Sequence, residues 1–332
     1  MKRVTIATST IGLIAAVGLL AWQAWQPAQV ALGNLASCQG YNGRPDGWPG
    51  DPHAGMVQLN GGTFTPGVEG GYPDERPFGE VDIEAFWIDR TEVTRAQFAD
   101  FVAATGYVTE AERGNSGALF TAPGESDTGN TPPPWWQIVP GANWRYPDGP
   151  DKSSSAAADN MPVRLVTLVD ARAYAAWRGN ELPTEAEWEY AAQASAASQR
   201  LGEEPVDHQG RPTANYWQGV FPLYDEGEDG IAGVAPVGCF ASNAYGLYDM
   251  IGNLWEWTSD PQMAPLFSHA NGDPGSLRHT EGSRPYVIKG GSYLCAASYC
   301  ARYRTAARER QEADLATSHV GFRTVRQVPN AP

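Results

Sequence analysis

The chain has 332 residues, and its 23 Lys and Arg against 38 Asp and Glu give a formal net charge of −15 at neutral pH. This sign disfavours nucleic-acid binding, which requires a basic surface to neutralise phosphates, and attachment to anionic lipid. Hydrophobic residues make up 42% of the chain, which is enough for a buried core and excludes a disordered protein. The 37 glycines, 26 prolines and 12 tryptophans predict a loop-rich fold with aromatic anchors and few long helices.

The N-terminus, residues 1–24, is predicted to be a signal anchor or signal sequence. Lys2 and Arg3 precede a mostly apolar run, residues 4–22, whose length is close to that of a membrane span. We expect an exported protein that is anchored in the inner membrane and faces the periplasm, or a secreted one if the signal is cleaved near Ala31. Residues 25–51, rich in Gly, Pro, Gln and Asn, are expected to form a linker.

Residues 52–328 are predicted to form a single domain of the α+β class. A strand is expected around Val57–Leu59, where apolar and polar residues alternate. Three helices are expected to begin after Thr94, Thr167 and Thr184, because each threonine starts a capping-box pattern followed by an apolar stripe. Elsewhere Gly and Pro interrupt short apolar runs, and no internal repeat or heptad pattern is found.

The four cysteines, Cys38, Cys239, Cys295 and Cys300, carry the chain's candidate redox or metal chemistry. Disulfides are the common state of cysteine pairs in exported proteins, and four cysteines permit three pairings, among which the sequence does not choose. Cys295 and Cys300 are five positions apart and can converge if the intervening loop turns. Two thiolates form a ligand set that selects Cu(I). A Cys295–Cys300 disulfide is the alternative, and it is the more common arrangement in an exported chain.

Two acidic segments offer oxygen ligands of the kind that calcium prefers. One runs from Asp249 to Glu256 around Gly252, and the other lies within residues 215–231. Each of them, taken alone, is more often a capped turn than an ion site.

Ordered motifs along residues 55–327 resemble the formylglycine-generating enzyme, or sulfatase-modifying factor, family. They are WIDRTEVT (87–94), TGY (105–107), PWW (134–136), GANWR (141–145), LPTEAEWEY (182–190), YGLYD (245–249), GNLWEW (252–257), GGS (290–292) and GFR (321–323). The catalytic branch of this family carries two cysteines with four residues between them after Gly-Gly-Ser-Tyr, and Cys295 and Cys300 match that pattern.

The resemblance implies a single domain with little regular secondary structure, related to C-type lectin-like folds. It also implies an oxidase that uses Cu(I) and dioxygen to convert a cysteine of a client sulfatase, in a Cys-x-Pro-x-Arg-like motif, to Cα-formylglycine. By resemblance, Cys295 and Cys300 hold the copper, Ser292 and Tyr299 line its pocket, and Trp255 forms an aromatic wall. Two structural Ca²⁺ sites carry over, the first with Asn215, Tyr216, Asp229 and Ile231, and the second with Asp249, Gly252, Leu254 and Glu256.

Several features depart from the family pattern. Cys239 matches no family position with an assigned role, so a Cys38–Cys239 pair and free thiols both remain open. His319 stands where an asparagine often precedes the Gly-Phe-Arg tail. The alternative function is a noncatalytic binding or scaffolding domain with a structural Cys295–Cys300 disulfide. The iron-dependent sulfoxide synthases that share this domain are disfavoured, because the chain lacks room for their additional His-rich helical domain.

Overall fold

The computed structural model describes residues 32–329 except 78, 124–134, 152–157, 195–199 and 263–283. The expected signal anchor, residues 1–24, lies outside the described residues. Among the helices described, none has the length and apolar character needed to cross a bilayer.

The three predicted helices are confirmed with their caps. They are α3 (Arg95–Thr105), α5 (Leu168–Arg178) and α6 (Glu185–Ala192), and each is preceded by the predicted threonine in a complete capping box. Helices α3 and α5 each end at a glycine in the left-handed conformation. The shorter helical elements, which the sequence analysis does not predict, are α2 (Leu35–Gln39), η1 (Pro73–Glu75) and α4 (Glu110–Arg113).

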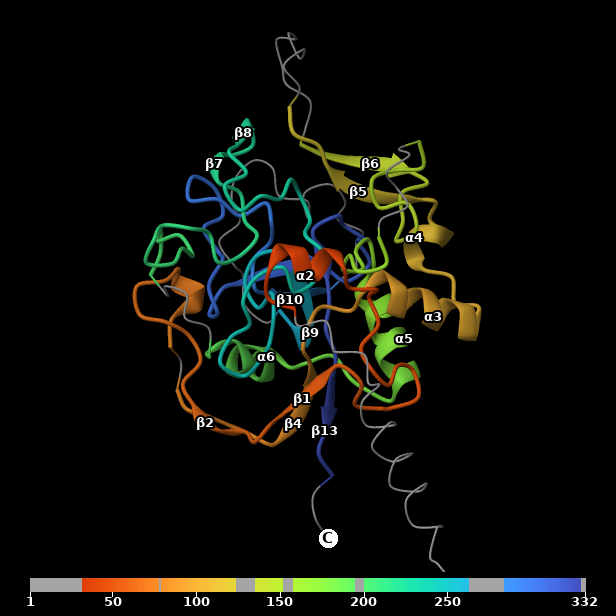
Figure 1. Cartoon of the computed structure of the whole chain (residues 1–332), viewed down its shortest axis with the longest axis horizontal. Coiled ribbons are helices and arrows are strands. Elements are labelled where there is room, and N and C mark those ends of the chain that lie inside the picture. The colour runs from red at the N-terminus through yellow and green to blue at the C-terminus, as the bar shows by residue number, and fades with distance from the viewer. Residues whose placement is uncertain are drawn as a thin grey trace, which may run out of the picture. The chain divides into compact units, whose positions relative to one another are not determined.

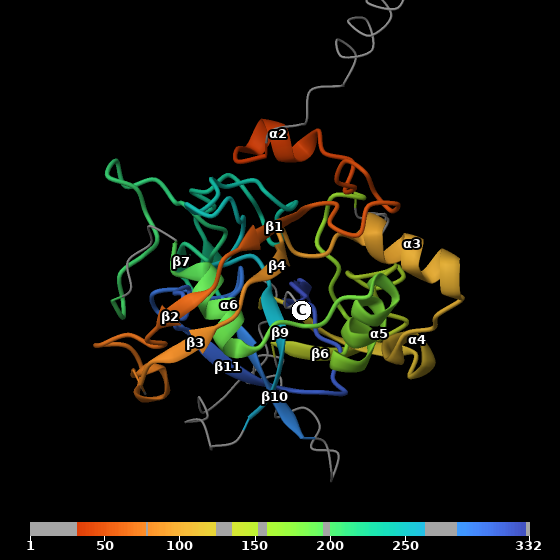
Figure 2. The ribbon, with the colours of Figure 1, turned by 90° about the horizontal axis from the view of Figure 1, so that it is seen from below.

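Two small sheets organise the strands (Figures 1 and 2). The larger has the order β11-β10-β9-β12, in which β12 runs parallel to β9 and the other pairs are antiparallel. Its strands are β9 (Trp255–Pro261), β10 (Pro285–Lys289), β11 (Arg308–Glu312) and β12 (Val320–Gly321). The smaller, β1-β4-β13, comprises Met56–Leu59, Phe86–Asp89 and Val325–Gln327. Three hairpins complete the set: β2–β3 (Gly62–Phe64, Val81–Ile83), β5–β6 (Ser116–Phe120, Trp136–Pro140) and β7–β8 (Gly219–Val220, Tyr224–Asp225).

Aromatic side chains form much of the core, as the composition predicts. Phe98 on α3 is fully buried and contacts Tyr174 on α5, with a ring separation of 5.9 Å, and Trp144, at 5.1 Å. Helices α3 and α5 lie side by side in both views and pack on Phe322, which follows β12. Burial of each such ring contributes about 2–3 kcal/mol, so this cluster fixes the helices against the larger sheet.

The segment at residues 32–51 differs from the expected linker. It contains α2, whose buried Cys38 forms a disulfide with Cys239, 201 positions away. The side-chain amide of Asn160 donates a 2.6 Å hydrogen bond to the carbonyl of Cys38. Glycine and proline form ordered turns here. A composition rich in these residues therefore does not distinguish a linker from a surface segment that a disulfide holds to the domain. Of the two states left open for Cys38 and Cys239, the disulfide is the one found.

Candidate active site

The loop between β10 and β11 carries both candidate thiols. It begins with Gly290 and Gly291, which adopt φ values of +98° and +80°. A Cβ on Gly291 would lie 2.6 Å from the carbonyl oxygen of Arg302, so only glycine permits this close approach. The Gly-Gly turn therefore folds the start of the loop against its end and brings Cys295 and Cys300 together.

The two thiols face one another without forming a disulfide. Their Sγ atoms are 3.2 Å apart, and both cysteines are free. Burial opposes ionisation of Cys295, but the hydrogen bond with Cys300, two backbone interactions and the charge of Arg302 lower its pKa overall. The same hydrogen bond, followed by burial, raises the pKa of Cys300 well above its ordinary value. The pair is thus poised to share one negative charge between two sulfurs.

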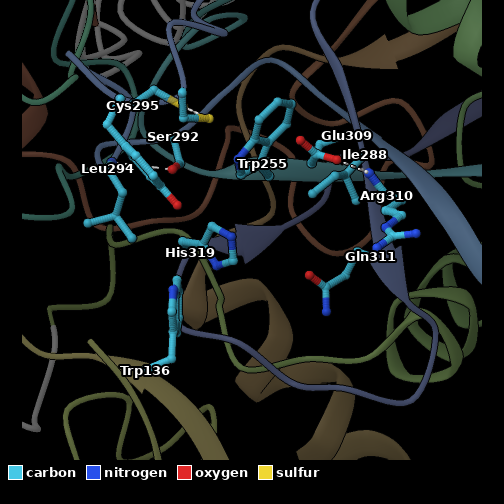
Figure 3. A pocket seen from close by; sticks show the side chains of 12 residues that line it. Trp136, Trp255, Ile288, Ser292, Leu294, Cys295, Glu309, Arg310, Gln311 and His319 are labelled. Atoms are coloured by element: carbon cyan, nitrogen blue, oxygen red, sulfur yellow. Dashed lines mark hydrogen bonds between the residues drawn. The ribbon is translucent and has the colours of Figure 1, made fainter. Parts of the chain in front are cut away.

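A cavity of about 60 Å³ opens beside this pair (Figure 3). Its size suits a cysteine side chain or a few water-sized groups rather than a large ligand. All five residues predicted to be catalytic line it: Ser292, Cys295, Tyr299 and Cys300 from the loop, and Trp255 from β9. The remaining walls are Trp136, Ile288, Leu294, Glu309, Arg310, Gln311 and His319.

His319 contributes a neutral imidazole to the cavity wall. Burial lowers the pKa of His319 to about 3, and its Nδ1 atom has no hydrogen-bond partner. Its ring centroid lies 4.7 Å from that of Trp136, and in Figure 3 the two side chains lie next to each other below Ser292. The imidazole therefore adds a hydrogen-bonding group without adding charge.

Buried ion pairs support the loop from behind. The guanidinium of Arg302 binds Asp74 and Glu75 at 3.1 and 3.0 Å, and Arg304 also binds Glu75. Glu75 is 1% exposed and both arginines are equally well buried. These contacts connect η1 to the residues that directly follow Cys300, and they place positive charge near the thiols.

Two residues of the second predicted calcium site, Asp249 and Glu256, belong to a buried cluster of carboxylates. Glu92, Asp249 and Glu256 are near one another. Glu256 accepts two 2.7 Å contacts from the guanidinium of Arg323 and a 2.7 Å hydrogen bond from the indole N–H of Trp188. Burial, Asp249 and Glu256 raise the pKa of Glu92 well above its usual range, and burial raises the pKa of Asp249 to about 6. One carboxylate oxygen of Glu92 is buried without a hydrogen-bond partner. This excess of buried negative charge suits a bound cation.

The first predicted calcium site adjoins the second. A Cβ on Gly252 would lie 2.2 Å from the carbonyl oxygen of Asn215, which shows how closely the two segments pack. In the first site the side-chain amide of Gln218 donates to the Tyr216 carbonyl and, at 3.0 Å, to Asp229. Asp229 also accepts a 2.9 Å bond from the backbone N–H of Ile231. The carbonyl oxygen of Tyr216 and a carboxylate oxygen of Asp229 thus converge on one point, which the amide nitrogen of Gln218 occupies.

No three His, Cys, Asp or Glu side chains in the described part of the chain are arranged as a ready metal-ligand group.

Comparison with known proteins identifies the family. The model of the "sulfatase-modifying factor enzyme 1-like domain" matches residues 45–328. The chain belongs to this family. It is 46% identical to the formylglycine-generating enzyme of Thermomonospora curvata over 283 residues, covering 81% of this chain and 92% of that protein. It is 42% identical to the formylglycine-generating enzyme of Mycobacterium tuberculosis, over 81% and 97% of the two chains.

Less similar relatives include a protein named inactive C-alpha-formylglycine-generating enzyme 2 from Mus musculus, 37% identical over 81% of this chain and 84% of that one. Among solved structures, PvdO from Pseudomonas aeruginosa superposes with a TM-score of 0.52 at 25% identity, covering 82% and 94% of the two chains. Both the resemblance and the α+β class predicted from the sequence are confirmed.

The sequence analysis does not predict much of the cavity wall. Glu309, Arg310 and Gln311 on β11 carry no motif, and only the pairing of β11 with β10 brings them to the cavity. Ile288 and Leu294 read as ordinary core residues. Trp136 belongs to a quoted family motif, but its position gives no sign of contact with His319.

Proposed function

We propose that this chain is a formylglycine-generating oxidase, which converts a cysteine of a client sulfatase to Cα-formylglycine. The observation that carries the proposal is the pair of free thiols, 3.2 Å apart, at a cavity of cysteine size. The two formylglycine-generating relatives at 46% and 42% identity support the choice of reaction. A structural disulfide would have favoured the noncatalytic alternative, whereas these cysteines are free.

Cu(I) is the cofactor we propose for Cys295 and Cys300. Two soft sulfur donors at a buried position suit Cu(I), which tolerates low coordination numbers. Bound copper would supply the activation of dioxygen. The protein's own contribution is to hold two sulfurs together, to admit the client thiol to a small cavity and to limit water there. Ser292, Tyr299 and Trp255 are the residues we propose to position the thiol or dioxygen, because all three line the same cavity.

Structural calcium is the second proposal. In the second site, the unpaired oxygen of Glu92 and the raised pKa of Asp249 both indicate negative charge that a cation would stabilise. Asn253 connects the two sites, because its side chain accepts a bond from Asn215 at 3.0 Å and donates one to Glu92 at 2.8 Å. The residues of the second site therefore fit the ion, and Ca²⁺ there would fix the segment that leads into Trp255. The first site offers the same kinds of oxygen ligand, from Asn215, Tyr216, Asp229 and Ile231.

The client and the compartment are proposals of the same kind. We propose a sulfatase segment with a Cys-x-Pro-x-Arg-like motif, whose arginine suits a strongly acidic protein. We further propose export, with residues 1–24 acting as an inner-membrane anchor on the periplasmic side or as a cleaved signal. The Cys38–Cys239 disulfide is consistent with an oxidising compartment.

The test is conversion of a peptide in air. The full chain, reconstituted with Cu(I), should convert the thiol of a Cys-x-Pro-x-Arg peptide to an aldehyde, followed by mass spectrometry. Cys38 belongs to the folded unit, so a truncation at residue 50 should be avoided. Conversion that depends on copper and disappears in Cys295→Ala supports the proposal. Absence of conversion, with a stable Cys295–Cys300 disulfide after mild reduction, would instead support the binding module.

A further inference from the structure

We propose that the tip of the β7–β8 hairpin binds apolar side chains that flank the modified cysteine of the client. The tip consists of Val220, Leu223 and Tyr224 and is called here the apolar tip. This inference rests on the proposed function, because it assigns a surface to the polypeptide whose thiol enters the cavity.

The apolar tip is unusual in its exposure. Val220, Leu223 and Tyr224 are 57%, 70% and 64% exposed, more than any other large hydrophobic residue in the described part of the chain. Single exposed hydrophobic residues are normal on protein surfaces, but three within five positions on one tight hairpin form a patch of the kind that contacts a partner.

Direct contacts attach this hairpin to the loop between the two thiols. The ring of Phe221 stacks on that of Tyr299, with centroids 4.4 Å apart and planes only 8° from parallel. The hydroxyl of Ser298 accepts a 3.3 Å bond from the backbone N–H of Phe221 and donates one of the same length to the carbonyl of Gly219. Tyr299 lines the cavity, so the hairpin packs directly against a residue of the cavity wall.

The distances suit a short extended peptide. Leu223 follows Phe221 by two residues, so their Cα atoms are at most about 7 Å apart. An extended client advances about 3.3 Å per residue, so residues only a few positions from the bound thiol reach the apolar tip.

Charge around the tip favours a polypeptide over a lipid surface or a second copy. No Lys or Arg occurs from residue 212 to residue 277, whereas Asp225, Glu226, Glu228 and Asp229 directly follow the tip. These acids repel anionic headgroups, and the net charge of −15 opposes self-association. A client segment that combines apolar residues with an arginine complements both features.

The experiment compares two peptides with the same Cys-x-Pro-x-Arg core, one flanked by leucine and valine and the other by serine. Three proteins are used as full chains with Cu(I): wild type, Val220→Thr/Leu223→Ser, and the control Val169→Thr. Val169 on α5 is 52% exposed, which is similar to the exposure of Val220. In both views α5 lies far from β7. We expect wild type and control to prefer the apolar-flanked peptide by about tenfold in kcat/KM, and the tip variant to lose most of that preference.

The same preference is measured as binding, by fluorescence anisotropy of the labelled peptides. If wild type converts neither peptide, the proposed function fails, and the binding data still decide the role of the tip. Equal use of both peptides by wild type, or an unchanged preference in the tip variant, would overturn the inference. If the tip variant keeps its peptide preference but loses binding to phosphatidylcholine vesicles, a lipid surface is the occupant of the tip in place of the client. If it keeps that preference but changes its oligomeric state, the occupant is a second copy of the chain.

Discussion

Cys300 reaches Cys295 because its own backbone is left-handed, with a φ of +51° that brings the two sulfurs to 3.2 Å. A non-glycine residue in this conformation costs about 1–2 kcal/mol, and such strain persists only where surrounding contacts hold it. Here the contacts are the ion pairs of Arg302 and Arg304 with Glu75. Strain at a thiol is consistent with a site arranged for chemistry.

Replacing Cys300 by serine tests the copper site. We expect Cys300→Ser to abolish Cu(I) binding and turnover while the melting temperature stays nearly unchanged, because serine has a similar shape and no disulfide is lost. Copper binding is measured by competition with a Cu(I) chelator, and stability by calorimetry. A large loss of stability with copper binding intact would argue for a structural role of the pair.

Replacing Glu75 by glutamine tests the support behind the thiols. The change removes the buried charge that pairs with both Arg302 and Arg304, so we expect a loss of about 3–5 kcal/mol in the free energy of unfolding. Denaturant titration measures it. Glu110→Gln is the control, because Glu110 pairs with Arg113 at the surface and should change stability little. Equal effects of the two changes would contradict the buried-clamp interpretation.

Removing calcium tests the two oxygen-rich sites. We expect a calcium chelator to lower the melting temperature, because it leaves the buried carboxylates Glu92, Asp249 and Glu256 without a cation. Added Ca²⁺ should restore it. In Glu92→Gln, with less buried charge, the chelator should have a smaller effect. Identical melting curves with and without calcium would count against both sites.

The buried carboxyl of Asp89 makes the stability of the protein depend on pH. Burial raises its pKa to about 6, despite two hydrogen bonds from Thr324 that act to lower it. Because the folded pKa exceeds the unfolded value of about 3.9, the contribution to stability is full below pH 4 and is lost as pH rises through 6. Relative to wild type, Asp89→Asn should therefore gain up to about 3 kcal/mol between pH 4 and 7, measured by urea unfolding. A difference that does not vary with pH would refute this assignment.

Breaking the Cys38–Cys239 disulfide tests whether residues 32–51 belong to the domain. The bond closes a long loop, so Cys239→Ser should cost about 2–5 kcal/mol of unfolding free energy. It should leave Cu(I) binding unchanged, because neither cysteine lines the cavity. Unaltered stability would show that this segment is only loosely attached.

Local features were predictable wherever neighbouring residues decide them. Thr94, Thr167 and Thr184 cap their own helices, and left-handed glycines at 106 and 179 end two of them, because these interactions extend over only three or four residues. The family motifs also identified five residues that prove to line one cavity.

Long-range relationships required the tertiary structure. The order of strands in the larger sheet brings Gln311 on β11 and His319 before β12 to the same cavity as Cys295. Likewise, only the tertiary fold places Cys38 beside Cys239. The exposed tip at Leu223 likewise gains meaning from the stacking of Phe221 on Tyr299, 78 positions later. The sequence by itself thus predicted three helices, whose caps depend on short-range contacts, and the family, whose motifs follow one another along the chain. It did not decide between a disulfide and free thiols at Cys295 and Cys300, which are free in the structure. The walls of the cavity were decided by packing between distant segments, which no local pattern records.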